Sequence, residues 1–489
     1  MKTIPSERNG YVLLQTLVFG VVAIVVIFGL IAYTVSIFKL GNKTVLSEQA
    51  FEVAEAGLEY YRWHLAHAPS DFTNGTGQPG PYVKNFLDKN GVLIGTFTLT
   101  ITPPVIGSTL VTIKSDGRVA ADSAIKRTII ARLSIPSFAN YATVTNSFIR
   151  FGEGTEVFGP LHSNAGLRLD GLAHNLVTSA SSTFFDPDPG HGSGQGVEFG
   201  VHTHVNPPPG SGVNNLYRPA EAPPSVVPLR NDVFMAGRSF PAPLVNFSVI
   251  TSDLVQMKAD AQSGGRYFAS STMKGYLVVL KNNDTFDLFR VNSTTTPPMS
   301  CSNPGNQPNW GTWSVNATTL LGNYTNPANG LLFLDDNVWV QGNINTARLT
   351  IVAARVPDNS IPLRRSITIN NNLTYTNYNG QDTLALIGQQ DVNVGLVSST
   401  TLRIDAALIA QWGRVGRYYY ESDCNPYHIR TLLTLYGTII TANRYGFAYT
   451  DGTGYTNRTI IYDAFLLYNP PPFFPEVTTF YDIISWKEE

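Results

Sequence analysis

Few residues in this 489-residue chain have the type and spacing that metal or acid–base chemistry needs. His202-Thr203-His204 would place two imidazoles on one side of a strand, and with His162 or His191 they could bind a metal ion. No cysteine or glutamate at a ligand spacing completes that set. We therefore expect a solvated loop here, and we predict no metal site and no cofactor. The segment 186–192 could offer oxygens to calcium, but its ligand density is low and a turn is expected.

Charged residues on the predicted strands form only a loose catalytic set. Asp335, Asp336, Arg403 and Asp405 supply the carboxylates and base that polysaccharide lyases use, yet their spacing is not diagnostic. The sequence contains no G-x-S-x-G, Walker, H-E-x-x-H or dinucleotide-binding motif. The run 417–420, Arg-Tyr-Tyr-Tyr, could stack on sugars or on a partner, or could cover the side of the fold. We predict that the chain is not an enzyme, with lyase-like activity as the minor alternative.

Cys301 and Cys424 are the two cysteines of the chain. In an exported protein they could form a disulfide. Such a bridge would close a loop of about 120 residues and could stabilise the fold by about 4–5 kcal/mol in the chain-entropy model. The sequence does not give their separation in space, so a disulfide and two free thiols both remain open. Cys424 lies in a predicted loop, 421–426.

The composition of the chain argues against one class of function and favours one class of fold. The formal charge is −2 and charged residues make up 14% of the chain, which argues against nucleic-acid binding through bulk electrostatics. Small polar residues and tyrosines alternate with β-branched residues over most of the length. This composition favours a β-rich domain outside the cytoplasm.

The elements that would position these residues begin with a long apolar segment. No Asp, Glu, Lys or Arg occurs between Tyr11 and Phe38. A helix of this length spans about 40 Å and can cross a bilayer core of about 30 Å. A cleavable secretory signal is disfavoured, because the run is about twice the usual length and 36–39 is a poor cleavage site. A plain single-pass anchor, with Lys2 and Arg8 on the cytoplasmic side, is the simplest alternative.

The junction R-N-G/Y-V-L-L-Q at residues 8–15 resembles the class III leader of type IV pilins and pseudopilins. This resemblance implies a leader over 1–10, cleavage by a prepilin peptidase after Gly10, and N-methylation of the new terminal residue, Tyr11. Gln15 occupies the filament-assembly position where the family usually has a glutamate that pairs with a neighbour's terminal amine. Ala32 stands where many major pilins have a kinking proline. Both departures fit a minor subunit better than a major one.

The apolar helix is expected to continue as an amphipathic helix to residue 66. No proline occurs between Pro5 and Pro69, although Gly41-Asn42 could loosen the helix. The block 49–59, QAFEVAEAGLE, resembles the A-x-x-x-A-E-A-G-L-E stretch of PilX-like minor pilins. That resemblance implies that the first half of the helix packs among filament subunits and the second half on its own domain. Spacings of three and four predict one apolar face, made by Phe51, Ala54, Leu58, Tyr61 and Leu65.

Residues 67–140 are predicted to form a small β-meander packed on this helix. Period-two alternation in 96–102 and 126–135 indicates two strands, and 110–115 lies between them. The tripeptide 115–117, Ser-Asp-Gly, is predicted to be a turn, and Pro136 ends the unit. The strand–turn–strand order after the helix also resembles PilX-like proteins.

From 141 to 489 we predict a right-handed parallel β-helix. Ile351, Ile369, Leu386 and Ile404 recur about every 17–18 residues, a period typical of stacked coils. A large β-sandwich is the alternative, but 338–410 lacks the hairpin turns that it needs.

Three further segments complete this body. Residues 159–167 resemble a G-P-V-H-S-N-G phrase of β-helical, minor pilin-like proteins, and 462–472 with 484–486 resemble their closing segment. Proline-rich residues from about 180 to 330 are predicted to be an irregular insertion. Within it we expect a short helix over 251–262, capped by Thr251 or Ser252, with Leu254, Met257 and Ala261 on one face.

Together these features predict a mainly β protein with one long N-terminal helix, a minor pilin- or pseudopilin-like subunit of a type IV filament or type II secretion-like system. A body of this size is too bulky to repeat densely, so we expect a tip position and a role in assembly priming, adhesion or secretion. Expected partners are a prepilin peptidase, other pilins, the bacterial cytoplasmic membrane before assembly, and a surface glycan or host surface. The body would lie outside the cytoplasm. The alternative is a single-pass, membrane-anchored surface protein whose β-helix binds or cleaves carbohydrate.

Overall fold

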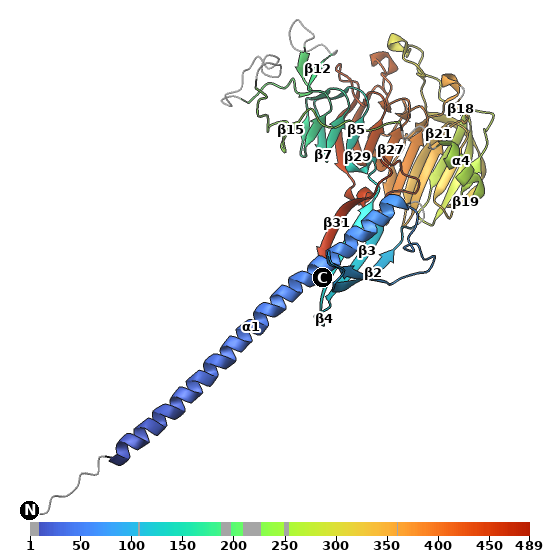
Figure 1. The fold of residues 1–489 in the computed structure, drawn as a ribbon. Helices are drawn as coiled ribbons and strands as arrows, with labels where there is room; N and C mark the ends of the chain where they lie inside the picture. The colour runs from blue at the N-terminus through green and yellow to red at the C-terminus, as the bar shows by residue number, and fades with distance from the viewer. Residues whose placement is uncertain (1–8, 106–107, 187–196, 209–225, 249–253, 359) are drawn as a thin grey trace, which may run out of the picture. The chain divides into compact units, whose positions relative to one another are not determined.

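The computed structural model describes residues 9–105, 108–186, 197–208, 226–248, 254–358 and 360–489. The chain divides into two compact units. The first comprises 1–103, 111–134 and 480–489, and the second comprises 104–110 and 135–479. Figure 1 shows a long helix with an antiparallel sheet in the first unit and a stack of short strands in the second. Residues 480–489 were predicted to close the β-helical body; this was wrong, because they form a strand of the first unit.

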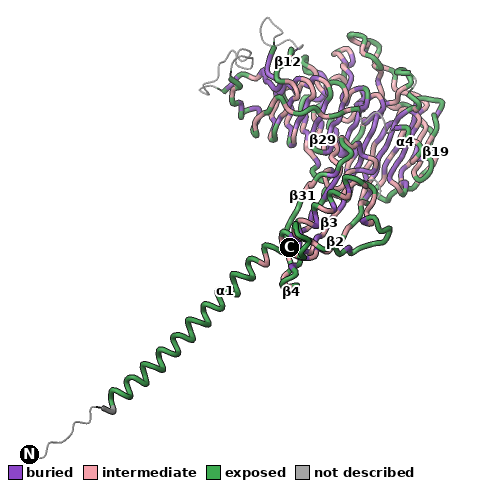
Figure 2. Tube along the Cα trace, viewed as in Figure 1, coloured by how far each residue is buried: buried purple, intermediate pink, exposed green. Residues whose placement is uncertain are grey.

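Helix α1 runs without interruption from Asn9 to His67, so Gly41-Asn42 does not break it. Its span from Tyr11 is long and apolar enough to cross a membrane. Residues 11–40 are exposed throughout, as the green start of the helix in Figure 2 shows. The hydroxyls of Thr16, Thr34 and Ser36 bond carbonyls one turn earlier, at 2.8–3.0 Å. Apolar surroundings require such internal satisfaction of polar groups.

The second half of α1 packs on the sheet through its small residues. A Cβ atom on Gly117 would lie 2.2 Å from the carbonyl oxygen of Ala50 and 2.4 Å from the backbone nitrogen of Ala54. A Cβ on Gly57 would lie 2.4 Å from Ser115 Oγ. The helix backbone therefore touches the strand. The predicted apolar face is confirmed except for the half-buried Phe51; the buried residues are Ala50, Val53, Ala54, Leu58, Tyr61 and Leu65.

The sheet of the first unit is an antiparallel meander to which a distant strand is added. Arg127 of β4 bonds Glu488 of β31 and donates from Nη1 to Ser47 Oγ of α1 at 2.8 Å, so it links both elements to the meander. The predicted turn at Ser115-Asp116-Gly117 was wrong, because β3 continues through it and the chain turns at 120–121. Gly117 serves the close approach of α1 and not a turn. The strand order is β1 (Tyr82–Leu87), β2 (Leu93–Thr102), β3 (Val111–Val119), β4 (Asp122–Ser134) and β31 (Asp482–Glu488).

The second unit is a stack of parallel coils, which excludes the β-sandwich alternative. Its coils do not follow one another in chain order. The chain enters at β5, builds through β8 and β11 to β15, and then resumes at the opposite end of the ladder with β16. One ladder runs β16 (Arg266–Phe268), β20 (Leu331–Leu334), β22 (Arg348–Ala353), β25 (Thr383–Gly388), β27 (Thr401–Ala410), β29 (Ile429–Thr441), β5 (Thr143–Thr145), β8 (Leu161–Ser163), β11 (Val177–Ser179) and β15 (Arg238–Ser239).

The late coils therefore stack directly on the early ones, and we call this junction the seam. Ile439 of β29 opposes Thr143 of β5, and Ile460 of β30 opposes Val157 of β7. The other strands of the unit are β6 (Ile149–Phe151), β7 (Thr155–Phe158), β9 (Leu167–Leu169), β10 (Leu172–Ala173), β12 (Thr183–Phe185), β13 (Val197–Phe199), β14 (Val201–His202), β21 (Val338–Ile344), β23 (Ile367–Thr368), β24 (Leu373–Tyr375), β26 (Val392–Val394), β28 (Val415–Arg417) and β30 (Gly454–Tyr462).

The aliphatic ladder is real, but its predicted register was wrong. Ile351 opposes Leu386, which opposes Leu408 on the next coil. Ile404 belongs to another ladder, opposite Leu373, and Ile369 lies outside both. Residues that are 17–18 positions apart in the sequence therefore lie on different faces of the coils and do not stack on one another. All four predicted residues are nevertheless fully buried.

The predicted irregular insertion at 180–330 is in part regular. β17 (Gly275–Leu280) pairs in parallel with β21 as a coil of the stack, and it extends into the antiparallel strands β18 (Thr285–Thr294) and β19 (Val315–Thr325). Helix α4 (Leu254–Ser263) buries Leu254, Met257 and Ala261, as predicted. The proposed caps Thr251 and Ser252 lie outside the described residues.

Candidate functional site

The predicted processing residues lie at the start of α1. Gly10 is in its first turn, and Tyr11 and Gln15 are exposed on the helix. The Gln15 side chain makes no hydrogen bond to any residue that the structure describes. The leader residues 1–8 lie outside the described part.

A cleft of about 790 Å³ lies at the seam of the second unit. Early coils supply one wall, from 150–153, 168–170 and 204–205, and late coils supply the other, from 414 and 443–456 with 458. The lining includes five arginines, Arg150, Arg168, Arg414, Arg444 and Arg458, against two carboxylates, Glu153 and Asp170. Of the aromatic residues in the lining, Tyr449 is half-buried, whereas Tyr445, Phe447 and Tyr455 are buried. Arginine favours carboxylate or phosphate groups, and aromatic rings can stack on sugars.

The arginines of the cleft differ in how they are held. Arg458 is buried and donates to Thr155 Oγ1 at 2.9 Å, across the seam. Arg168 and Arg150 both donate to Asp170 Oδ2, at 2.8 and 3.1 Å. Arg444, in contrast, is exposed, with its guanidinium 5.1 Å from the centroid of the Phe148 ring. Arg444 is therefore the exposed arginine of the cleft, whereas Arg458 joins the two walls and Arg168 bonds Asp170 and Asp186 within the early wall.

A buried polar cluster adjoins this cleft and shares His204, Arg168 and Asp170 with it. The strands β12 and β13 pair antiparallel, and β14 follows along β9. They bring together the ligand atoms of Asp186, Glu198, His202 and His204, which all lie within 4.8 Å of one another. Burial lowers the pKa of His204, and a hydrogen bond with Glu198 opposes that shift.

The expectation of a solvated loop at 202–204 was therefore wrong, because both histidines are buried. His162 is not part of the cluster: it is buried elsewhere and bonds Thr178 at 2.9 Å and Asn164 at 3.1 Å. His191 lies outside the described residues, as does the predicted turn after Asp186. Spacing alone missed the cluster, since Asp186 and Glu198 meet only through the pairing of β12 with β13.

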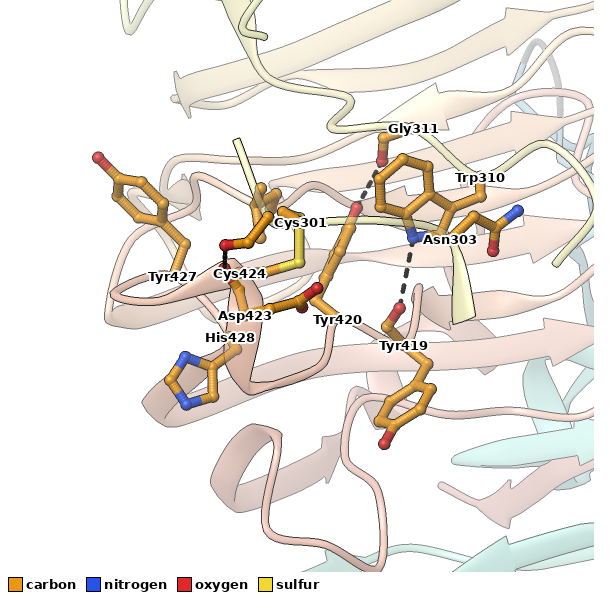
Figure 3. The surroundings of a disulfide bond; sticks show 12 residues. Cys301, Asn303, Trp310, Gly311, Tyr419, Tyr420, Asp423, Cys424, Tyr427 and His428 are labelled. Atoms are coloured by element: carbon orange, nitrogen blue, oxygen red, sulfur yellow. Dashed lines mark hydrogen bonds between the residues drawn. A yellow bond between two sulfur atoms is a disulfide. The ribbon is translucent and has the colours of Figure 1, made fainter. Parts of the chain in front are cut away.

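Cys301 and Cys424 form a disulfide. Figure 3 shows it beside Tyr420, whose hydroxyl donates to the carbonyl oxygen of Gly311 at 2.7 Å. Trp310 donates to the carbonyl oxygen of Tyr419 at 3.3 Å. The bridge thus ties the segment after β18 to the loop before β29.

The run 417–420 covers the stack and does not offer a free stacking surface. Arg417 is fully buried and donates to the carbonyl oxygens of Leu396 and Tyr427, at 3.0 and 2.6 Å. Burial lowers its pKa to about 10. Tyr418 and Tyr420 are also buried.

The carboxylates considered for lyase chemistry have structural partners. Asp335 accepts from Lys258 Nζ at 2.8 Å, and Asp336 accepts from the backbone nitrogen of Ser271 at 2.8 Å. Asp405 is buried and accepts from Arg403 Nε at 2.9 Å and from Tyr378 at 2.6 Å. These contacts hold neighbouring segments together, and the carboxylates are not arranged in the cleft.

Asp463, directly after β30 at the seam, is a buried acid that sequence reasoning did not single out. Burial raises its pKa to about 6. Its Oδ1 accepts from the backbone nitrogen of Phe465 at 3.0 Å and from Tyr436 at 3.2 Å.

No model of a known protein family matches this chain, and no curated protein sequence matches it. Among solved structures the chain is similar to the crystal structure of the competence-associated pilin ComZ from Thermus thermophilus. The alignment covers 91% of this chain and 98% of that chain, at 14% sequence identity and a TM-score of 0.30. At that score the superposition carries no argument about the fold or the function of this chain.

Proposed function

We propose that this chain is a pilin-like subunit of a type IV filament or a related secretion filament, anchored in the cytoplasmic membrane before assembly. One observation carries the proposal: two halves of a single uninterrupted helix have opposite surroundings. Residues 11–40 are apolar and exposed, whereas the half from Ala50 to Leu65 is docked on an antiparallel sheet. An apolar helix surface of this length needs lipid or other apolar helices around it.

Processing would convert the membrane form into the filament form. Cleavage after Gly10 by a prepilin peptidase would leave Tyr11 as a methylated terminus. The apolar half of α1 would then move from lipid into a bundle of neighbouring subunits. Gln15 in place of glutamate, and a body of this size, favour a minor subunit near the filament tip.

The test is the mature N-terminus of the full chain produced together with a prepilin peptidase. We expect one cut between Gly10 and Tyr11 and one added methyl group, measured by mass spectrometry. Gly10→Ala should abolish the cut. Gly20→Ala is the matched control and should be processed normally, because no atom lies within 4 Å of a Cβ there. An intact Met1, or a cut at another bond, would contradict the proposal in favour of a plain anchor.

The arginine-lined cleft supports a second proposal, binding of an anionic glycan. Arg444 is its exposed arginine, and the half-buried Tyr449 provides a ring on which a sugar can stack. On a glycan array, the detergent-solubilised full chain should retain acidic glycans and lose most of them after Arg444→Ala. Arg118→Ala, in the first unit, changes the net charge equally and should bind like the wild type. Equal retention of neutral and acidic glycans would show that this cleft does not select glycans by their negative charge. Cleavage of the bound glycan would instead support the lyase alternative.

A further inference from the structure

We propose that the buried cluster beside the cleft binds one divalent transition-metal ion, with zinc(II) the best fit. This site goes beyond the filament role and the glycan cleft. Its ligands come from the ends of β12 and β14, from β13, and from the residue two positions after β14. They are Asp186 Oδ2, Glu198 Oε2, His202 Nε2 and His204 Nε2.

The four nitrogen–oxygen separations in the cluster are close to the edges of a tetrahedron, and all four ligand atoms lie within 4.8 Å of one another. His202 Nε2 lies 3.5 Å from Asp186 Oδ2 and 3.4 Å from Glu198 Oε2. His204 Nε2 lies 3.5 and 2.9 Å from the same two oxygens. A tetrahedral zinc with bonds of about 2.0–2.1 Å has ligands about 3.3–3.4 Å apart. The side chains need only small shifts to surround one ion.

His202 points an unsatisfied nitrogen into the centre of the cluster. Its ring is fully buried, and Nδ1 donates to the carbonyl oxygen of Phe199 at 2.8 Å. That bond places the proton of the neutral ring on Nδ1 and the lone pair on Nε2. Among the residues that the structure describes, Nε2 has no hydrogen-bond partner, and it faces two carboxylates. A lone pair buried against carboxylate oxygens is unfavourable, and a cation converts the same geometry into bonds.

The surroundings resemble the second shell of a metal site. Arg168 Nη1 holds Asp186 Oδ2 at 3.2 Å, and Asp170 Oδ1 accepts the backbone nitrogen of His204 at 2.9 Å. Such outer contacts orient metal ligands. Gly200 packs the turn before β14 against the chain, since a Cβ there would lie 1.7 Å from the carbonyl oxygen of Ser181. The ligands are therefore held on a fixed turn.

The donor set selects the cation and its role. Two imidazoles with two carboxylates suit zinc, whereas calcium prefers six to eight oxygens. Four protein ligands make a closed site, which is typical of a structural ion. β12 and β13 form a separate two-stranded sheet in the described structure, and a pair of strands alone is marginally stable. The ion would fasten this pair to β14 and to the wall of the cleft.

The proposal is tested on the full chain in detergent, stripped with a chelator and then titrated with zinc. Metal analysis should give one tightly bound zinc per chain. X-ray absorption should show only nitrogen and oxygen ligands, at about 2.0–2.1 Å. His202→Ala and His204→Ala should each weaken zinc binding at least about 100-fold, the upper range for loss of a second-shell contact. His174→Ala is the matched control, because His174 is a histidine paired to Glu156 at 2.8 Å outside the cluster; it should leave zinc binding unchanged.

Each outcome decides the proposal. A wild-type chain that takes up no zinc overturns it. An absorption spectrum without imidazole ligands also overturns it, as does unchanged zinc affinity in Glu198→Gln, which keeps the shape of the side chain. If the alanine variants do not fold, the wild-type absorption spectrum and Glu198→Gln still give the answer.

Discussion

The two units of this molecule bury apolar surface in different ways. In the first unit a helix backbone lies directly on a strand, at positions where Ala50, Ala54, Gly57 and Gly117 leave room. In the second unit, large aliphatic side chains stack on one another from coil to coil, as Ile351 does on Leu386. The first arrangement depends on the absence of side-chain volume, and the second depends on its presence.

This difference teaches which substitutions each unit tolerates. Added methyl groups should damage the first unit at a few points, because backbone atoms cannot move aside cheaply. The second unit should be sensitive to added charge anywhere along its ladders, because every coil contributes to one continuous core. Four substitution experiments, in order of falling effect, test this contrast.

The largest effect is expected from a charge in the continuous core of the second unit, to which Ile369 belongs although it lies outside the two ladders. Ile369→Asp would bury a carboxylate with no partner and should lower the free energy of unfolding by about 3–5 kcal/mol. Asn371→Asp, on an exposed position two residues later, should change it by less than about 0.5 kcal/mol. Denaturant unfolding of the full chain measures both. Equal effects at the two positions would show that Ile369 is not part of the core.

The disulfide is the next test, because both cysteines of the sequence lie in the second unit and form a disulfide there. Replacing Cys301 and Cys424 by serine together should cost about 2–5 kcal/mol, since the bridge spans a sequence separation of 123 residues. The loss should appear in the unfolding of the second unit. Protection of α1 amides from hydrogen exchange should not change. A loss of that protection would contradict the view that the disulfide stabilises only the second unit.

Added volume tests the first unit. Gly117→Ala should destabilise it by about 1–3 kcal/mol, because the new methyl group meets the backbone of α1. Hydrogen exchange of amides 50–65 reads this effect directly. Gly41→Ala, on the exposed half of the same helix, has open space around it and should be neutral or stabilising by up to about 1 kcal/mol. A harmless Gly117→Ala would mean that the close approach is not needed.

The last pair of effects appears only over part of the pH range and should have opposite signs in the two units. Burial raises the pKa of Asp463 to about 6 in the second unit, so its stabilising contribution is present below about pH 4 and is lost as the pH rises through 6. Asp463→Asn should therefore be more stable than wild type above pH 6, by about 1–3 kcal/mol, and equal to it near pH 4.

Asp71 in the first unit supplies the opposite case. Hydrogen bonds from the Thr73 side chain and backbone lower its pKa to about 2. Its contribution is present above about pH 4 and is lost as the pH falls toward 2. Asp71→Asn should thus be less stable than wild type at neutral pH and should converge with it in acid. Parallel pH profiles for the two variants would contradict both assignments.

Local patterns predicted the helices well. The absence of proline gave the length of α1, and spacing gave the buried faces of α1 and α4. Long-range order could not be predicted, because the period of 17–18 residues counts strands and not coils. No local sequence pattern indicates that β29 pairs with β5, which lies almost 300 residues earlier in the chain. The cleft depends on that meeting, since Arg150 and Arg444 come from opposite sides of the seam.

The attachment of β31 to β4 has a consequence for biogenesis. All of the second unit except residues 104–110 lies in the sequence between these two strands. Arg127 of β4 contacts both Glu488 of β31 and Ser47 of α1. During synthesis the sheet under α1 stays incomplete until every coil has been made. A chain that terminates early would expose β4 as an open edge, which invites aggregation or degradation. The sheet of the first unit therefore forms completely only after the coils of the second unit have been translated.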